Sequence, residues 1–135
     1  MAILLVDDTA SKRLALRAVL TSLGHSIIEA DSGRVAIRCV GDQRFAVIVL
    51  DVRMPIMNGI ETAAVIRQNE TSQHTPIIFV TAYETAVKYP IEPGEQENSE
   101  YMVMPVVPDL LRLRVSEIID EYLASGVAPA VPSPA

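Results

Sequence analysis

Short apolar runs and segments with helical spacing alternate along this chain. The runs are four or five residues long, as sheet strands are, and several are apolar throughout, which is typical of strands buried on both faces. A weaker β-compatible stretch follows the first of them. We therefore predict five strands, at residues 3–6, 26–30, 47–50, 76–80 and 101–104.

The segments between these strands carry apolar residues three and four positions apart, so we predict helices there. The first helix follows Asp7-Asp8, with Thr9 or Ser11 as its N-cap and Gly24 beyond its end. The other helices are expected at residues 33–41, 60–68 and 108–125.

The segment between the fourth and fifth strands departs from this pattern. Residues 84–100 contain five glutamates and one lysine, Lys88, together with Pro90 and Pro93. A proline inside a helix removes a hydrogen bond and clashes with the preceding turn, at a cost of about 3 kcal/mol. We therefore expect a degraded fourth helix, reduced to a short turn and an acidic loop.

Strands that alternate with helices are typical of the α/β class, here a doubly wound five-stranded parallel sheet with helices on both faces. Right-handed crossovers bring the carboxyl ends of all the strands to one edge of such a sheet. The residues at these ends are Asp7, Asp8, Asp51, Thr81 and Met104. Parallel α/β sheets bind ligands at this edge, so we expect the functional site there.

Composition narrows the classes of function. The chain has 135 residues, enough for one domain, which we assign to 1–125, with 126–135 as a Pro/Ala-rich linker or tail. The formal charge of −6 argues against direct nucleic-acid contact by this domain, and no apolar run is long enough to span a membrane. The single cysteine, Cys39, cannot form an internal disulfide, which fits a cytoplasmic location.

The three carboxylates at the predicted edge indicate metal chemistry. Clustered carboxylates raise one another's pKa unless a cation neutralises them, and oxygen ligands favour a hard ion such as Mg²⁺ or Mn²⁺. A metal ion beside a nucleophilic carboxylate is an arrangement for phosphoryl transfer, because the metal takes up charge on the transferring oxygens. The hydroxyl of Thr81 could donate to one of those oxygens.

Motifs at these strand ends resemble one known family. ILLVDD, VIVLDVRMPIMNG, PIIFVTAY and a last strand that ends before Pro105 are similar to the receiver domain of two-component response regulators, from residue 3 to about residue 124. The resemblance implies a flavodoxin-like sheet and a phosphoacceptor, Asp51, that takes its phosphoryl group from a histidine kinase or a phosphotransfer protein. Such a domain is a self-phosphorylating signalling module rather than a turnover enzyme.

The resemblance also implies a role for each of the other site residues. Asp8 binds Mg²⁺ directly, Asp7 binds it through water, and the backbone carbonyl of Arg53 is a further protein ligand beside the phosphoacceptor. Thr81 is the switch hydroxyl, and Tyr101 is the switch aromatic residue of the last strand.

The chain departs from the receiver pattern at the end of the last strand, where a lysine usually precedes the proline. Met104 stands there, and we expect neither Lys12, in the first helix, nor Lys88, in the acidic loop, to fill the role. A charge-assisted contact to the phosphoryl group is worth roughly 1.5–3 kcal/mol, so its loss predicts weakened switching. The alternative is a pseudo-receiver, a protein-interaction module that keeps the fold but acts without phosphorylation.

The last helix carries more apolar residues than one side of a sheet is expected to cover. We therefore expect any homodimer to form through this helix, by way of Val115, Ile118, Ile119, Tyr122 and Leu123. Residues 84–100 should not take part, because the negative charge of two such segments would repel.

Overall fold

The computed structural model describes residues 2–88 and 98–124, in which five strands alternate with five helices. In chain order the elements are β1 (Ala2–Val6), α1 (Ala10–Thr21), β2 (Ser26–Ala30), α2 (Gly33–Asp42), β3 (Val47–Asp51), α3 (Gly59–Ile66), β4 (Ile77–Ala82), α4 (Tyr83–Lys88), β5 (Ser99–Met104) and α5 (Pro108–Ala124). All paired strands are parallel, in the order β2-β1-β3-β4-β5. The predicted flavodoxin-like, doubly wound sheet is confirmed.

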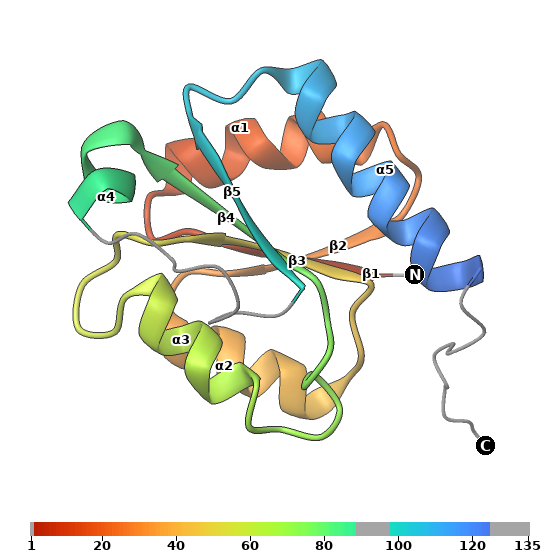
Figure 1. Ribbon diagram of the computed structural model, residues 1–135, viewed down its shortest axis with the longest axis horizontal. Coiled ribbons are helices and arrows are strands. Elements are labelled where there is room, and N and C mark those ends of the chain that lie inside the picture. The colour runs from red at the N-terminus through yellow and green to blue at the C-terminus, as the bar shows by residue number, and fades with distance from the viewer. Residues whose placement is uncertain (1, 89–97, 125–135) are drawn as a thin grey trace.

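The sheet separates two hydrophobic clusters, because successive side chains of a strand point to opposite faces. In β1, Leu4 and Val6 pack with residues of α2 and α3, whereas Ile3 and Leu5 pack with residues of α1 and α5. Figure 1 shows these two pairs of helices on opposite sides of the sheet. Every residue of β1 and β3 is buried, and the two strands are neighbours in the sheet, so packing on both faces fixes the positions of the acids at their carboxyl ends.

Side-chain caps determine where α2 and α3 begin. The hydroxyl of Ser32 accepts a hydrogen bond from the Val35 N–H at 3.2 Å, at the predicted start of α2. Asn58 and Glu61 form a reciprocal capping box: each side chain accepts a hydrogen bond from the other's backbone N–H, at 2.8 and 2.9 Å. The capping box anchors α3 directly after the loop that follows β3.

The described part of the fourth helix ends at Lys88, the last described residue before residue 98. α4 has six residues, Tyr83–Lys88. The predicted acidic loop falls mostly on residues 89–97, which lie outside the described residues, as does the predicted linker at 126–135.

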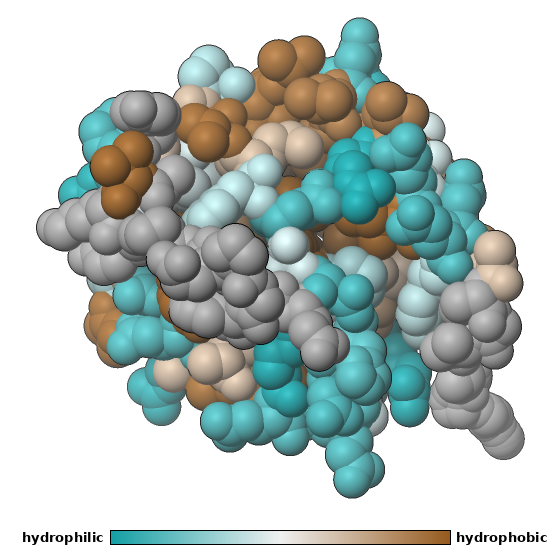
Figure 2. Space-filling view, in the orientation of Figure 1, coloured by the Kyte–Doolittle hydropathy of each residue, from teal (hydrophilic) through white to brown (hydrophobic). Residues whose placement is uncertain are grey.

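α5 is buried more deeply than its sequence led us to expect. Val115, Ile118 and Ile119 are at most 5% exposed, because they form part of the core between α5 and the sheet. The prediction that these three residues offer a dimer surface is therefore wrong. The exposed apolar side chains of α5 are Leu110, Leu113 and Leu123, and Figure 2 shows hydrophobic surface over the first turns of this helix.

No helix in residues 2–88 and 98–124 is both long enough and apolar enough to cross a membrane.

Candidate functional site

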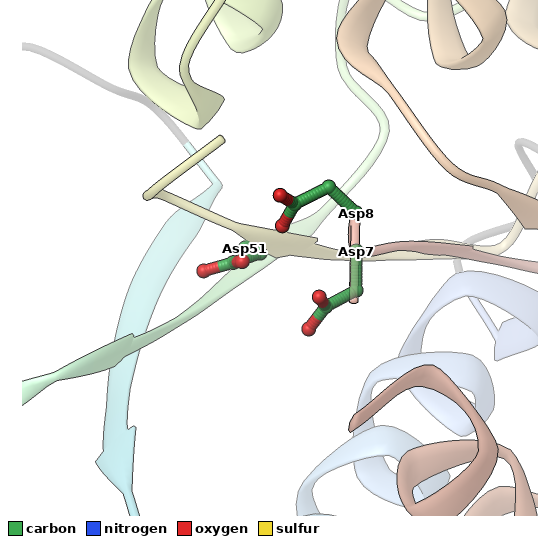
Figure 3. Close-up of side chains that lie close together, drawn as sticks. All are labelled: Asp7, Asp8 and Asp51. Carbon is green, nitrogen blue, oxygen red and sulfur yellow. The ribbon is translucent and has the colours of Figure 1, made fainter. Parts of the chain in front are cut away.

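Three aspartates meet at the carboxyl ends of β1 and β3. Asp7 and Asp8 follow β1, and Asp51 is the last residue of β3. The two strands are neighbours in the sheet, with Val6 paired to Leu50, so the chain brings the acids together from segments more than forty residues apart. One carboxylate oxygen from each residue lies within 4.8 Å of the other two (Figure 3). The predicted convergence of these acids at one edge of the sheet is present.

The three carboxylates differ in burial. Asp8 is exposed, whereas Asp7 and Asp51 are only 1% and 3% exposed. Figure 3 shows the Asp7 and Asp8 carboxylates on opposite faces of the sheet, with Asp7 on the side of α1 and α5. One oxygen of Asp7 accepts a hydrogen bond from the Thr9 N–H at 2.9 Å, and one oxygen of Asp51 accepts one from the Arg53 N–H at 3.1 Å. Thr9 stands at the N-cap of α1, but its side chain makes no capping hydrogen bond.

Burial makes the two inner carboxylates hard to ionise. It raises the pKa of Asp7 above the ordinary value, and it also raises the pKa of Asp51, with a further contribution from the negative charge of Asp7. Hydrogen bonds and the charge of Lys12 act in the opposite direction without cancelling the effect. The site is therefore one that an additional cation would stabilise.

Lys12 supplies a cation to this site, contrary to our expectation. Its ammonium nitrogen lies 3.3 Å from Asp51 Oδ2, within hydrogen-bonding distance, and 3.6 Å from Asp7 Oδ2. Burial alone would lower the pKa of Lys12, but the charges of Asp51 and Asp7 raise it overall, so the side chain is held in its ammonium form. Lys12 was not among the predicted site residues, and the structure places it beside Asp51 and Asp7.

The remaining predicted residues lie on β4, on β5 and in the loop after β3. Thr81 follows the β4 residue that pairs with Asp51, and its buried hydroxyl has no hydrogen-bond partner among the described residues. Arg53 turns its side chain to solvent. Tyr101 packs against Phe79 with ring centroids 5.6 Å apart, and burial raises its pKa. Met104 is half-buried and packs against the α1/α5 cluster.

The start of α3 lies against the backbone of the phosphoacceptor candidate. The Gly59 N–H donates to the Val52 carbonyl at 2.8 Å. A Cβ atom at position 59 would lie 2.2 Å from the Asp51 carbonyl oxygen, far inside van der Waals contact. Only glycine permits this approach, which ties the loop that carries Arg53 to the end of β3.

The donor set fits a small hard cation. All the clustered ligand atoms are carboxylate oxygens, which Mg²⁺ and Mn²⁺ bind in preference to softer ligands. Asp7 Oδ2 is buried and has no hydrogen-bond partner among the described residues, although the Lys12 ammonium lies 3.6 Å away. A buried carboxylate oxygen of this kind is costly unless a cation or a donor satisfies it.

Comparison with known proteins decides the family. A model of the response regulator receiver domain matches residues 3–116. This chain belongs to that family. The receiver is 31% identical to the chemotaxis protein CheY of Pseudomonas aeruginosa over 121 residues, which are 89% of this chain and 97% of that protein. It is 32% identical to the transcriptional regulatory protein ZraR of Klebsiella oxytoca over 133 residues, but it spans only 29% of ZraR.

Solved structures support the same family. The receiver domain of a sensor histidine kinase from Pseudomonas aeruginosa PAO1 matches this receiver with a TM-score of 0.78 and 27% identity, over 88% of this chain and 97% of that one. That structure is described with a magnesium ion coordinated in its active site cleft. The match extends through nearly the whole of both chains, so the fold and the family agree.

Lys12 is the site residue that the sequence interpretation missed, and its position contained a usable signal. It is the third residue of α1, the helix that begins just after the acids of β1. Side chains of a helix lean toward its amino terminus, and a lysine is long enough to reach back over the preceding turn. A lysine in the first turn of this helix is thus directed at the carboxyl end of β1.

Proposed function

We propose that this receiver accepts a phosphoryl group on Asp51 from a histidine kinase or a phosphotransfer protein. The observation that carries the proposal is the buried carboxylate of Asp51, which lies at the end of β3 beside two further acids in a receiver fold. Its backbone hydrogen bond from Arg53 and its contact with Lys12 hold the carboxylate in a defined orientation. In this role the domain is a signalling module that is modified once per cycle, rather than a turnover enzyme.

The transfer exchanges one phosphorus bond for another. A carboxylate oxygen of Asp51 attacks the phosphorus of a phosphohistidine, an O–P bond forms, and the P–N bond to the imidazole breaks. The departing imidazole nitrogen takes up a proton from solvent. Water later attacks the phosphorus of the acyl phosphate, which releases inorganic phosphate and restores the carboxylate.

Mg²⁺ or Mn²⁺ would be held by Asp8, Asp51 and the Arg53 carbonyl, with Asp7 binding through water. When bound, the ion neutralises charge on the transferring phosphoryl oxygens. One carboxylate oxygen from each acid lies within 4.8 Å of the other two, and this clustering supports a shared cation. The magnesium in the related sensor-kinase receiver supports this assignment by analogy.

Thr81 and Tyr101 would convert phosphorylation into a change of shape. The Thr81 hydroxyl is buried without a hydrogen-bond partner among the described residues, so a phosphoryl oxygen on the neighbouring strand would give it an acceptor. Tyr101 lies on β5, the strand next to the one that carries Thr81, and packs on Phe79. We propose that movement of Thr81 toward Asp51 changes the packing of Tyr101.

The second candidate is a pseudo-receiver that binds partners without phosphorylation. The observation that favours it is Met104, which packs its apolar side chain into the α1/α5 cluster at the position where receivers usually carry a lysine. The two candidates differ in one respect that can be measured, which is whether Asp51 accepts phosphate.

Location, nucleic-acid contact, domain bounds and self-association remain predictions from the sequence. A cytoplasmic location, the absence of direct nucleic-acid contact and the assignment of 1–125 to the receiver and 126–135 to a linker rest on the sequence alone. Self-association through α5 would use its exposed apolar side chains, Leu110, Leu113 and Leu123.

Intact mass after incubation with acetyl phosphate and Mg²⁺ tests the proposed function. We expect the wild-type protein to gain one phosphoryl group and Asp51→Asn to gain none. Asp42→Asn is the matched control, because it removes an exposed acid of α2 and should be phosphorylated as the wild type is. No gain on the wild-type protein would favour the pseudo-receiver, and a gain on Asp51→Asn would place the acceptor elsewhere.

A further inference from the structure

We propose that Lys12 is the phosphoryl-binding ammonium of this receiver, and that it reaches the site from α1 while Met104 occupies the usual lysine position on β5. The inference rests on the proposed function, since it names the residue that binds the phosphoryl group once Asp51 carries it. The juxtaposition of Lys12 Nζ and Asp51 Oδ2, 3.3 Å apart, is the starting observation.

Among the side chains that the structure describes, which do not include that of Lys88, Lys12 is the one cation paired with these acids. Its ammonium contacts Asp51 Oδ2 and lies 3.6 Å from Asp7 Oδ2. The neighbouring basic residue of α1, Arg13, makes other contacts: its guanidinium pairs with the Glu29 carboxylate and donates a hydrogen bond to the backbone carbonyl of Asp7. The Arg53 side chain is exposed, and no ion pair joins it to a described acid. Of the described side chains, that of Lys12 alone places an ammonium against a carboxylate oxygen of Asp51.

Lys12 and Met104 lie on the same side of the sheet, the side covered by α1 and α5. Met104 packs in the cluster that joins the sheet to α1 and α5, together with Leu16 of α1. Asp7 turns its carboxylate to this same side (Figure 3). A cation on α1 therefore approaches Asp51 from the side on which a longer, charged side chain at position 104 would lie, and the two positions can exchange roles.

The partial exposure of Lys12 leaves its ammonium room to follow the negative charge from the Asp51 carboxylate to a phosphoryl group bound there. Its side chain is 38% exposed, so the ammonium keeps contact with water while it pairs with buried acids. Transfer of a phosphoryl group to Asp51 places new anionic oxygens next to the oxygen that Lys12 already contacts. A hydrogen bond between an ammonium and such an oxygen is charge-assisted, and it gains strength as the negative charge of the acceptor grows.

The first test measures binding of beryllofluoride, a mimic of the phosphoryl group, in the presence of Mg²⁺ by isothermal titration. We expect Lys12→Met to weaken binding by about tenfold or more, which is the effect of losing one charge-assisted contact. Arg17→Met is the matched control: it removes the same charge from the same helix, but Arg17 pairs with Glu29 away from the acids, so its affinity should equal that of the wild type. The exchange variant, Lys12→Met with Met104→Lys, should bind more tightly than Lys12→Met alone.

A second measurement leaves Lys12 itself unchanged. The chain has two lysines, so labelling lysine side chains with ¹⁵N at Nζ gives two signals, and Lys88→Arg identifies that of Lys12. We expect beryllofluoride to shift the Lys12 signal in the wild type and to leave it unshifted in Asp51→Asn.

Three results would overturn the inference while leaving the proposed function intact: wild-type affinity in Lys12→Met, an equal loss in Arg17→Met, or an exchange variant no better than Lys12→Met. A Lys12 signal that does not respond when beryllofluoride binds the wild type would do the same. Failure of the wild type to bind beryllofluoride at all would instead remove the proposed function, and the inference with it.

Discussion

Replacing Gly59 by alanine should destabilise this receiver through a contact with the backbone of Asp51. A Cβ at position 59 would lie 2.2 Å from the Asp51 carbonyl oxygen and 2.8 Å from Val52 Cα. Both neighbours are backbone atoms of a buried segment, so they cannot rotate away as a side-chain end would. The start of α3 must therefore move from β3, which also weakens the hydrogen bond from Gly59 N–H to the Val52 carbonyl.

The magnitude follows from two opposing contributions. Forcing an extra methyl group into a packed site costs typically 1–3 kcal/mol, and contact with rigid backbone favours the upper end of that range. Alanine in place of glycine in a helix contributes at most about 1 kcal/mol in the other direction. We expect a net loss of about 2 kcal/mol in the free energy of unfolding, and a melting temperature lower by roughly 6–8 °C for a domain of this size.

Thermal and urea unfolding of Gly59→Ala and Gly41→Ala provide the comparison. Gly41 lies in α2, and a Cβ there would meet nothing within 4 Å. Its replacement should therefore stabilise the protein by about 0.5–1 kcal/mol through helix propensity alone. If Gly59→Ala is as stable as the wild type, or if both substitutions shift stability in the same direction, the close packing of α3 on Asp51 is not what limits this position.

Two further predictions concern charge and capping. Folding raises the pKa of Asp7 above its ordinary value of 3.8, so the unfolded chain loses this proton first as the pH rises, and the free energy of unfolding falls. The metal-free Asp7→Asn variant should therefore be more stable than the wild type at about pH 7 but not at about pH 4. Thermal unfolding in a chelator tests this, and a gain in stability at about pH 4 only would contradict the predicted sign. Asn58→Ala removes the capping box of α3 and should lower the free energy of unfolding by about 1 kcal/mol in urea unfolding, whereas an unchanged value would mean that the loop, rather than the cap, determines where α3 starts.

The fold and the meeting of the acids could be predicted because both depend on patterns that are local in the sequence. β1 and β3 are buried on both faces, so each is a continuous apolar run, and an acid directly after such a run marks the end of the strand. Parallel strands joined by right-handed crossovers then share one edge for their carboxyl ends. Asp7, Asp8 and Asp51 meet for this reason.

The position of Lys12 and the burial of α5 depend on packing that the sequence pattern does not specify. The lean of helix side chains directs Lys12 toward the end of β1, but its contact with Asp51 also depends on where α1 docks on the sheet, which residue spacing does not specify. α5 shares its face of the sheet with α1, so the two helices together enclose Val115 and Ile118. Counting the apolar residues of α5 by itself therefore overestimates the surface it leaves exposed.

Peptide mapping of the acyl phosphate tests the identity of the acceptor most directly. Trypsin should divide the three clustered acids between two peptides, 1–12 with Asp7 and Asp8, and 45–53 with Asp51 as its only side-chain carboxylate. Borohydride reduces an aspartyl phosphate to homoserine, which leaves the peptide lighter by one oxygen and heavier by two hydrogens. After treatment with acetyl phosphate and Mg²⁺, we predict this change in peptide 45–53 alone. The same change in peptide 1–12, or in neither peptide of a protein shown to carry phosphate, would contradict the assignment of Asp51 as the phosphoacceptor.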